Sequence, residues 1–297
     1  MDYVDLTDEV KLSRVVLGFW RYLDWKLSKS ECIAFIEQVL DLGITTMDHA
    51  DIYGDYTVEE AFGEVLAGRN DLKKQMQVVT KCGIVYPSAA ARVKYYNTST
   101  EHIIRQAESS LKKMQIEAID VFLLHRPDWF GDPENVAEAF YQLKKAGKVK
   151  SFGVSNYLPH EFRMLQSYCE EKLVTNQVEA SVLCMDNFEN GTINLCLENR
   201  IHPMIWSPLA GGRIFTSDQA HVKALRKVLT VIQEEVGAQS IDEIAFAWLL
   251  SHPAGMIPIT GSGEIDFVKK PVEALKYPLT PEQWYMIWTA VHGVKVP

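Results

Sequence analysis

The sequence contains no run of apolar residues long enough to cross a bilayer, which takes about 20 of them. Its first residues, Met1-Asp2-Tyr3-Val4-Asp5, have acidic flanks and no apolar core, unlike a signal peptide. The five cysteines are odd in number, and no two of them are spaced C-x-x-C. We therefore expect neither a disulfide framework nor a structural zinc site, but reduced thiols in a cytoplasmic protein without a membrane partner.

Positive charge is also scarce, because 30 Lys and Arg stand against 39 Asp and Glu, for a formal net charge of -9. A nonspecific nucleic-acid binder needs a basic face that neutralises phosphates, so we expect no nucleic-acid partner. Small neutral molecules are more plausible partners for a chain with this net charge than nucleic acids. The remaining composition, 47% hydrophobic and 23% charged, is ordinary for a globular protein.

A glycine-rich G-x-G-x-x-G turn after the first strand is missing as well. An open doubly wound sheet usually carries that turn, so its absence weighs against this architecture as the alternative fold. The glycine pairs that are present come late: Gly211-Gly212 follows a proline, and Gly261-Ser262-Gly263 follows the last predicted strand.

Short apolar runs alternate with longer amphipathic stretches along the whole chain. The runs predict eight strands, at Val15–Phe19, 45–48, 76–81, 119–125, 151–155, 175–180, 202–207 and 256–261. The amphipathic stretches predict helices from a cap at Ser30 to a stop at Gly43, and near 57–68, 99–114, 133–146, 159–170, 190–199, 240–251 and 264–275. The strands are nearly continuous apolar runs, as in a parallel sheet buried on both faces. Eight such units predict an α/β protein with a (β/α)8 TIM barrel.

Two further segments exceed the eight units. One is an additional helix near 218–236, before the seventh strand-helix unit, and the other is a C-terminal helix near 280–292. There is no low-complexity linker and no break in composition, so we expect residues 1–297 to form one barrel domain.

Four polar side chains follow or close predicted strands. Asp48, Lys81 and His125 end the second, third and fourth strands, and Tyr53 lies in the loop after the second. In such barrels the working residues lie at the carboxyl ends of the strands. A phenol with a pKa of about 10 exchanges protons poorly near neutrality, but a neighbouring ammonium held by a carboxylate lowers that pKa. The pattern therefore predicts an oxidoreductase that delivers a proton to a carbonyl oxygen.

The segment Met47-Asp48-His49-Ala50-Asp51-Ile52-Tyr53-Gly54 resembles the D-x-A-x-x-Y-G signature of the aldo-keto reductase superfamily, in particular its bacterial oxidoreductase-like branch. The lysine and histidine segments of that family match Lys81 and Leu124–Asp128. Further matches, in family order between Gly18 and about Leu275, are Gly153-Val154-Ser155-Asn156, Asn176-Gln177-Val178-Glu179 and Trp206-Ser207-Pro208-Leu209.

The resemblance implies an NAD(P)H-dependent reductase of aldehydes or ketones. Tyr53 would be the general acid, Asp48 and Lys81 would tune it, and His125 would orient the carbonyl. The expected nicotinamide contacts are Ser155, Asn156 and Gln177 to the carboxamide and Trp206 stacked on the ring. The expected phosphate contacts are Ser207, Leu209 and Gly211 at the pyrophosphate, and Gly261 and Ser262 at the adenosine phosphate.

The chain departs from the family at the adenosine end. Phe267 stands where the family usually has an arginine for the 2′-phosphate, and Lys270 and Pro271 replace its adenine-binding glutamate and asparagine. Glu264 adds a negative charge beside the expected phosphate, which weakens binding by repulsion. We expect NADP, with NAD as the alternative.

Aromatic residues in the strand-to-helix loops could wall a substrate pocket or cover the barrel rim. We expect Trp20 and Trp129 to contact the substrate, because their loops open on the same mouth as Tyr53. Trp25 is open to either role. The sequence does not identify the physiological carbonyl compound, the favoured direction or the oligomeric state.

Two other functions compete with a reductase. A metal-dependent hydrolase would use His49 and Asp51, but successive strand residues face opposite ways, so His49 should face away from Asp48, and we expect no metal site. A sensor that binds the nicotinamide cofactor without turnover is the second alternative.

Overall fold

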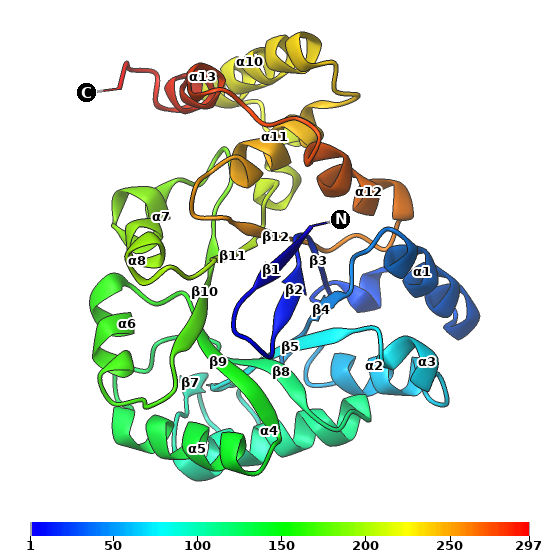
Figure 1. The fold of residues 1–297 in the computed structure, drawn as a ribbon, viewed down its shortest axis with the longest axis vertical. Coiled ribbons are helices and arrows are strands. Elements are labelled where there is room, and N and C mark those ends of the chain that lie inside the picture. The colour runs from blue at the N-terminus through cyan, green and yellow to red at the C-terminus, as the bar shows by residue number, and fades with distance from the viewer. Residues whose placement is uncertain (1, 297) are drawn as a thin grey trace.

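Residues 2–296 are described by a computed structural model in which eight parallel strands close into a barrel (Figure 1). The last strand pairs with the first through Ile259 and Val16. The barrel strands are β3 (Val16–Gly18), β4 (Thr46–Asp48), β5 (Gln77–Cys82), β8 (Ile119–Leu124), β9 (Val149–Ser155), β10 (Leu173–Glu179), β11 (Met204–Trp206) and β12 (Ile257–Thr260). This confirms the predicted (β/α)8 barrel, and the alternative of an open doubly wound sheet is wrong.

Helices surround the barrel as an outer layer (Figure 1). They are α1 (Lys29–Asp41), α2 (Val58–Val65), α4 (Thr100–Met114), α5 (Pro133–Lys145), α6 (Pro159–Gln166), α8 (Thr192–Asn199), α11 (Ile241–Leu250) and α12 (Ile265–Ala274). Side-chain caps fix where several helices begin. Ser99 is the N-cap of α4 and Asp132 that of α5, and each side chain accepts a backbone hydrogen bond. The predicted cap of the first helix was wrong, because Ser28 rather than Ser30 forms its capping box with Glu31.

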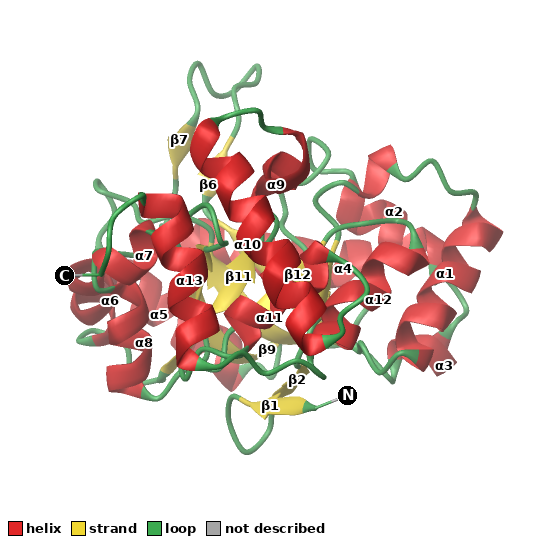
Figure 2. Ribbon diagram, turned by 90° about the horizontal axis from the view of Figure 1, so that it is seen from above, coloured by secondary structure: helices red, strands yellow, loops and turns green. Residues whose placement is uncertain are grey.

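An antiparallel hairpin closes the bottom of the barrel. It consists of β1 (Tyr3–Asp5) and β2 (Lys11–Ser13), and Figure 2 shows it below the barrel, beside the N-terminus. Val4, Val10 and Leu12 are buried in one cluster with side chains from the barrel strands, among them Val121 and Ile257. This hairpin was not predicted from the sequence.

A second hairpin rises at the opposite end, where β6 (Ile84–Val85) pairs with β7 (Tyr95–Tyr96) (Figure 2). It directly follows β5, so the loop after this strand stands over the carboxyl ends of the strands. Three short helices also lie in loops: α3 (Asn70–Lys73), α7 (Asp186–Glu189) and α9 (Arg213–Thr216). Two 3-10 turns, η1 (Tyr22–Asp24) and η2 (Ala210–Gly212), complete the loops.

The two helices outside the eight units lie side by side in Figure 1, as α10 (Ala220–Val236) and α13 (Pro281–His292). Both were predicted from the sequence, within about two residues of these bounds. A stacked pair of indoles joins α13 to α11: the rings of Trp248 and Trp284 are 4.7 Å apart, and each indole donates to the other residue's carbonyl. Among the described residues, no helix is both long enough and apolar enough to cross a membrane.

Candidate active site

Three barrel strands bring the predicted polar side chains to one end of the barrel. Asp48 ends β4, Lys81 lies near the end of β5 and His125 directly follows β8. Tyr53 lies in the loop between β4 and α2, which is tied to β5 where the Asp51 amide donates to the Lys81 carbonyl at 3.0 Å. Parallel register makes these strand ends neighbours, as the sequence predicted.

The amine of Lys81 is the centre of this arrangement. Its side chain is fully buried, and Nζ donates to both carboxylate oxygens of Asp48, at 2.8 and 2.9 Å. The same nitrogen donates to the His49 carbonyl at 2.6 Å and to the Tyr53 hydroxyl oxygen at 3.2 Å. The phenol oxygen therefore accepts from an ammonium, which leaves its own proton free to point toward a ligand.

Burial and charge act in opposite directions on the pKa values of Lys81 and Tyr53. Burial lowers the pKa of Lys81, but attraction to Asp48 and Tyr53 outweighs it and leaves that pKa above its ordinary value. Burial raises the pKa of the Tyr53 hydroxyl, while the Lys81 ammonium lowers it; the net direction is upward. The lysine therefore stays charged, and without a ligand the tyrosine stays protonated.

His125 faces the tyrosine edge-on, with the two ring centroids 6.0 Å apart. Burial, together with the positive charge of Lys81, holds the pKa of His125 well below its ordinary value, so the imidazole is neutral. Its Nδ1 is buried and has no hydrogen-bond partner among residues 2–296. A buried polar atom without a partner is costly, so the protein leaves hydrogen-bonding capacity of this ring unused.

The residues expected around a nicotinamide form a connected network next to Lys81. Asn156, with a positive φ of 63°, donates to Ser155 Oγ at 2.8 Å and accepts from the Trp206 indole at 3.0 Å. Ser155 Oγ donates to the Gln177 carbonyl at 2.9 Å, and the Gln177 amide donates to Asp48 at 2.8 Å. The structure thus brings these four together with the charged cluster, and their amide and hydroxyl groups fit a carboxamide ligand.

The loop after β11 carries an unusual density of left-handed residues. Ser207, Ala210, Gly211 and Gly212 all have positive φ, from 52° to 88°. A side chain added at Gly211 or Gly212 would meet no atom within 4 Å, so the backbone there faces open space. Arg213 was not predicted to take part, but its guanidinium donates to the Ala210 carbonyl at 3.0 Å. An exposed backbone next to a guanidinium fits an anion such as a pyrophosphate.

The loop after β12 is held by Trp25. The Trp25 indole donates to the Gly261 carbonyl at 3.2 Å, and a Cβ at Gly263 would lie 2.7 Å from Trp25 Cβ. Trp25 therefore packs against the backbone of the segment predicted to bind the adenosine phosphate. Within that segment, Ser262 Oγ accepts from the Glu264 amide at 3.1 Å.

The lysines near this loop are already engaged. Lys269 pairs with Asp266 at 3.2 Å, and Lys270 pairs with the buried Glu243 at 3.0 Å while also donating to Ser240 at 2.9 Å. Phe267, in the family's arginine position, is half exposed and carries no charge. Pro271 is buried inside α12, away from solvent.

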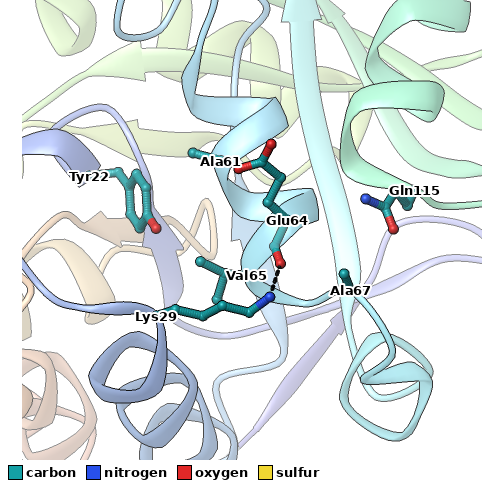
Figure 3. Close-up of a pocket in the computed structure, with 7 residues that line it drawn as sticks. All are labelled: Tyr22, Lys29, Ala61, Glu64, Val65, Ala67 and Gln115. Carbon is teal, nitrogen blue, oxygen red and sulfur yellow. Dashed lines mark hydrogen bonds between the residues drawn. The ribbon is translucent and has the colours of Figure 1, made fainter.

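The two tryptophans expected at the substrate are both exposed. Trp20 lies beside the Arg21 guanidinium, 5.2 Å from its ring centroid. Trp129, 87% exposed, lines a cleft of about 260 Å³ between α5 and α6, together with Tyr157, His160 and Met164. None of the four predicted catalytic residues lines that cleft. A larger hollow of about 470 Å³ lies between α1 and α2 (Figure 3), and it too is lined by none of them.

His49 faces away from Asp48, as strand alternation predicted. It is fully buried against Phe19, with ring centroids 4.3 Å apart, and against Phe62. Burial lowers its pKa to about 3, so the ring is neutral. Over residues 2–296 no three His, Cys, Asp or Glu side chains come together in a way that could hold a metal ion.

A closed parallel barrel thus carries the buried pair of Lys81 and Asp48 beside a partly buried Tyr53, and comparison with known proteins identifies its family. Residues 14–291 match the aldo/keto reductase family, so the chain belongs to that family. It is 48% identical over 300 residues to the uncharacterised oxidoreductase YcsN of Bacillus subtilis, with all of both chains covered. It is 40% identical over 300 residues to a 6-dehydroglucose reductase of Agrobacterium fabrum, again over both full lengths.

Solved structures agree on the fold. The aldo-keto reductase AKR11C1 from Bacillus halodurans, in its holo form, superposes with a TM-score of 0.80 at 22% identity, over 100% of this chain and 98% of that one. Family and relatives together support an enzyme that carries out carbonyl reduction as an oxidoreductase.

Proposed function

We propose that this chain is an NAD(P)H-dependent reductase that converts aldehydes or ketones to alcohols. The observation that carries the proposal is the position of the buried Lys81 amine, 3.2 Å from the Tyr53 hydroxyl and ion-paired with Asp48. A tyrosine placed in this way is suited to give a proton to a carbonyl oxygen.

The protein's part of the reaction is positioning and electrostatics. When bound, the nicotinamide supplies the hydride. Tyr53 donates the proton to the substrate oxygen, and the ammonium of Lys81 stabilises the phenolate that remains. The neutral imidazole of His125 would hydrogen-bond the substrate oxygen and fix its direction.

The cofactor would lie along the residues that the sequence predicts to bind it. Ser155, Asn156 and Gln177 would hold the carboxamide, and Trp206 would stack on the ring. Ser207, Leu209 and Gly211 would hold the pyrophosphate, with Arg213 as an additional cation beside it. Gly261 and Ser262, in the loop that Trp25 supports, would meet the adenosine phosphate.

The residues expected at the adenosine end of the cofactor favour weak discrimination between NADPH and NADH. Lys269 and Lys270 are each paired with a carboxylate, and Glu264 would repel a 2′-phosphate. Lysine is also a poorer partner than the bidentate arginine for a phosphate. We therefore propose that the chain uses NADPH but accepts NADH with similar affinity.

The substrate class is narrowed by the relatives. Two of them, 40% and 33% identical over nearly their whole lengths, are named 6-dehydroglucose reductase. We propose that sugar-derived aldehydes are among the carbonyl compounds that this chain reduces, with Trp20 and Trp129 as candidate contacts.

The test combines binding with turnover. Fluorescence titration of the purified protein with NADPH and NADH should give dissociation constants within about tenfold of each other. With either cofactor, Tyr53→Phe should lower kcat by about 10²–10⁴-fold, the range for a general acid, and leave the dissociation constants unchanged. Tyr141→Phe, an exposed tyrosine on α5, is the matched control.

Each result separates the candidate functions. A panel of aldehydes and ketones, including 6-dehydroglucose, should show turnover. Tight cofactor binding with no turnover on the panel would favour the sensor. A Tyr53→Phe variant as active as the unaltered protein would refute the acid assignment.

A further inference from the structure

A cluster of buried polar side chains lies behind the loop that carries Tyr53. Two of its members are carboxyl groups: Asp51, in the loop, is 3% exposed and Glu59, on α2, is 1% exposed. Glu59 accepts from Thr80 of β5 at 2.6 Å and from Ser110 of α4 at 3.0 Å, so both of its oxygens are satisfied.

Asp51 is satisfied on one oxygen only. Its Oδ2 accepts from the Gln106 amide on α4 at 2.9 Å. Its Oδ1 is buried and has no hydrogen-bond partner among residues 2–296. Burying an ionised carboxylate with a bare oxygen costs far more than burying the neutral carboxyl group.

Charged groups on α2 and α4 act on the pKa of Asp51. Burial is the largest influence on its pKa, followed by repulsion from Glu59 of α2, and both raise it. Gln106 and the Lys113 ammonium, both on α4, lower the pKa, which stands at about 8. The other titratable groups facing Asp51 are the Cys82 thiol of β5 and the Tyr53 and Tyr56 hydroxyls.

Asp51 is also part of the backbone that shapes the site. Its amide donates to the carbonyl of Lys81 at 3.0 Å, and the Tyr53 amide donates to the Ala50 carbonyl at 3.1 Å. The side chain anchors the same turn to α4 through Gln106. One residue therefore ties the tyrosine loop both to the strand of the catalytic lysine and to an outer helix.

We propose that Asp51 is a positioning residue for carbonyl reduction: as a neutral carboxylic acid held by Gln106, it keeps Tyr53 against Lys81. The inference rests on the proposed function. When Asp51 ionises, the new charge faces Glu59 in a buried space, and the loop shifts so as to bring the carboxylate toward water. Tyr53 moves with the loop, and kcat falls.

The kinetic test uses the isosteric variant Asp51→Asn, which is neutral at every pH. In the unaltered protein, kcat with saturating NADPH should fall about tenfold between pH 7 and pH 9, as expected for loss of an essential proton with a pKa of about 8. Asp51→Asn should keep the activity seen at pH 7 and lose this fall. The Tyr53 hydroxyl titrates higher, so its own effect on kcat remains at more alkaline pH in both proteins.

A second variant keeps the proposal testable if Asp51→Asn fails to fold. Gln106→Leu removes the hydrogen bond that lowers the pKa of Asp51, so the fall in kcat should move to higher pH. The dissociation constant of NADPH should stay unchanged in both variants, because neither side chain lies among the residues assigned to the cofactor. If Asp51→Asn kept the fall, or lost its activity at pH 7 with NADPH affinity intact, the positioning role would be overturned.

Thermal unfolding gives a readout that needs no substrate. An Asp in the unfolded chain has a pKa of about 3.9, so between about pH 4 and 8 the folded protein keeps a proton that the unfolded chain has lost. Stability from this group therefore falls as pH rises through that window, and Asp51→Asn should lack this loss. Equal slopes in the two proteins would contradict a neutral Asp51, whereas absence of turnover in the unaltered protein would contradict the proposed function instead.

Discussion

The ammonium of Lys81 is fully buried, and among residues 2–296 its only counter-charge within hydrogen-bond reach is the carboxylate of Asp48. Removing two charges from water costs several kcal/mol for each, which their attraction must offset. The pair is therefore weak evidence for stability, which agrees with the proposal that it acts on Tyr53. Either member left alone becomes an uncompensated buried charge.

We predict that Lys81→Met lowers the free energy of unfolding by about 3–5 kcal/mol, because it strands Asp48 without its partner. The double variant with Asp48→Asn should recover most of that loss, although it stays inactive. Urea unfolding followed by tryptophan fluorescence measures both. Lys269→Met, which breaks the exposed pair with Asp266, is the control and should change stability by less than about 1 kcal/mol.

Equal destabilisation of the single and double variants would show that the lysine stem, not the charge pair, carries the energy. Such a result would also weaken the view that Asp48 keeps the amine protonated beside the phenol.

The sequence placed four candidate residues together because parallel strands in sequential order make neighbours of consecutive strand ends. It also placed His49 on the opposite face from Asp48, since side chains alternate along a strand. It did not find Arg213 or the contact of Trp25 with Gly261, because both depend on how loops from distant strands meet. The roles of the site residues stay predictions until the variants are measured.

At the scale of single elements, α2 and α4 approach each other unusually closely. A Cβ on Gly63 of α2 would overlap the carbonyl oxygen of Lys113 and lie 3.0 Å from Met114 Cα, at the end of α4. These are backbone atoms, so no side chain can rotate away. The crossing brings Glu59 of α2 next to Ser110 of α4, and hence sets the buried carboxyl cluster.

We predict that Gly63→Ala destabilises the protein by about 1–3 kcal/mol, the usual range for overpacking, even though alanine is the better helix former. Urea denaturation gives the value. Glu60→Ala, at an exposed position of the same helix, should stay within about 0.5 kcal/mol of the unaltered protein. A neutral or stabilising Gly63→Ala would mean that the helices separate without cost.

The elements with strong periodicity were those that the sequence predicted. The eight barrel strands and both additional helices appeared within a few residues of their expected positions, because long apolar runs and helical spacing are local signals. Both hairpins were missed. β1 and β2 precede the first barrel strand, and β6 and β7 lie between β5 and α4, so both pairs stand outside the alternation of strands and helices. Their pairing is decided by what they cover.

At the scale of the whole molecule, the floor formed by β1 and β2 and the mouth beside β6 and β7 lie at opposite ends of the barrel (Figure 2). Leu12 is fully buried in the floor, in one cluster with side chains of the barrel strands. The mouth carries Tyr53 and Lys81. We propose that the chain, residues 1–297, unfolds as one domain because the hairpin, the strands and the helices share these contacts.

We predict that Leu12→Ala lowers the free energy of unfolding by about 2–5 kcal/mol, the usual cost of a cavity at a buried leucine. The transition should remain single, and kcat should stay unchanged because the floor is remote from the mouth. Scanning calorimetry and turnover assays test the two parts, with Lys11→Ala, the exposed neighbour, as control. Two separate transitions would contradict the single domain.

The floor has a consequence for how the protein is made. Val4, Val10 and Leu12 leave the ribosome well before Met204 and Ile257, which belong to the same buried cluster. The apolar face of the hairpin therefore stays uncovered until β12 has been synthesised and pairs with β3. A nascent chain halted before β12 therefore presents an uncovered hydrophobic strand pair to chaperones.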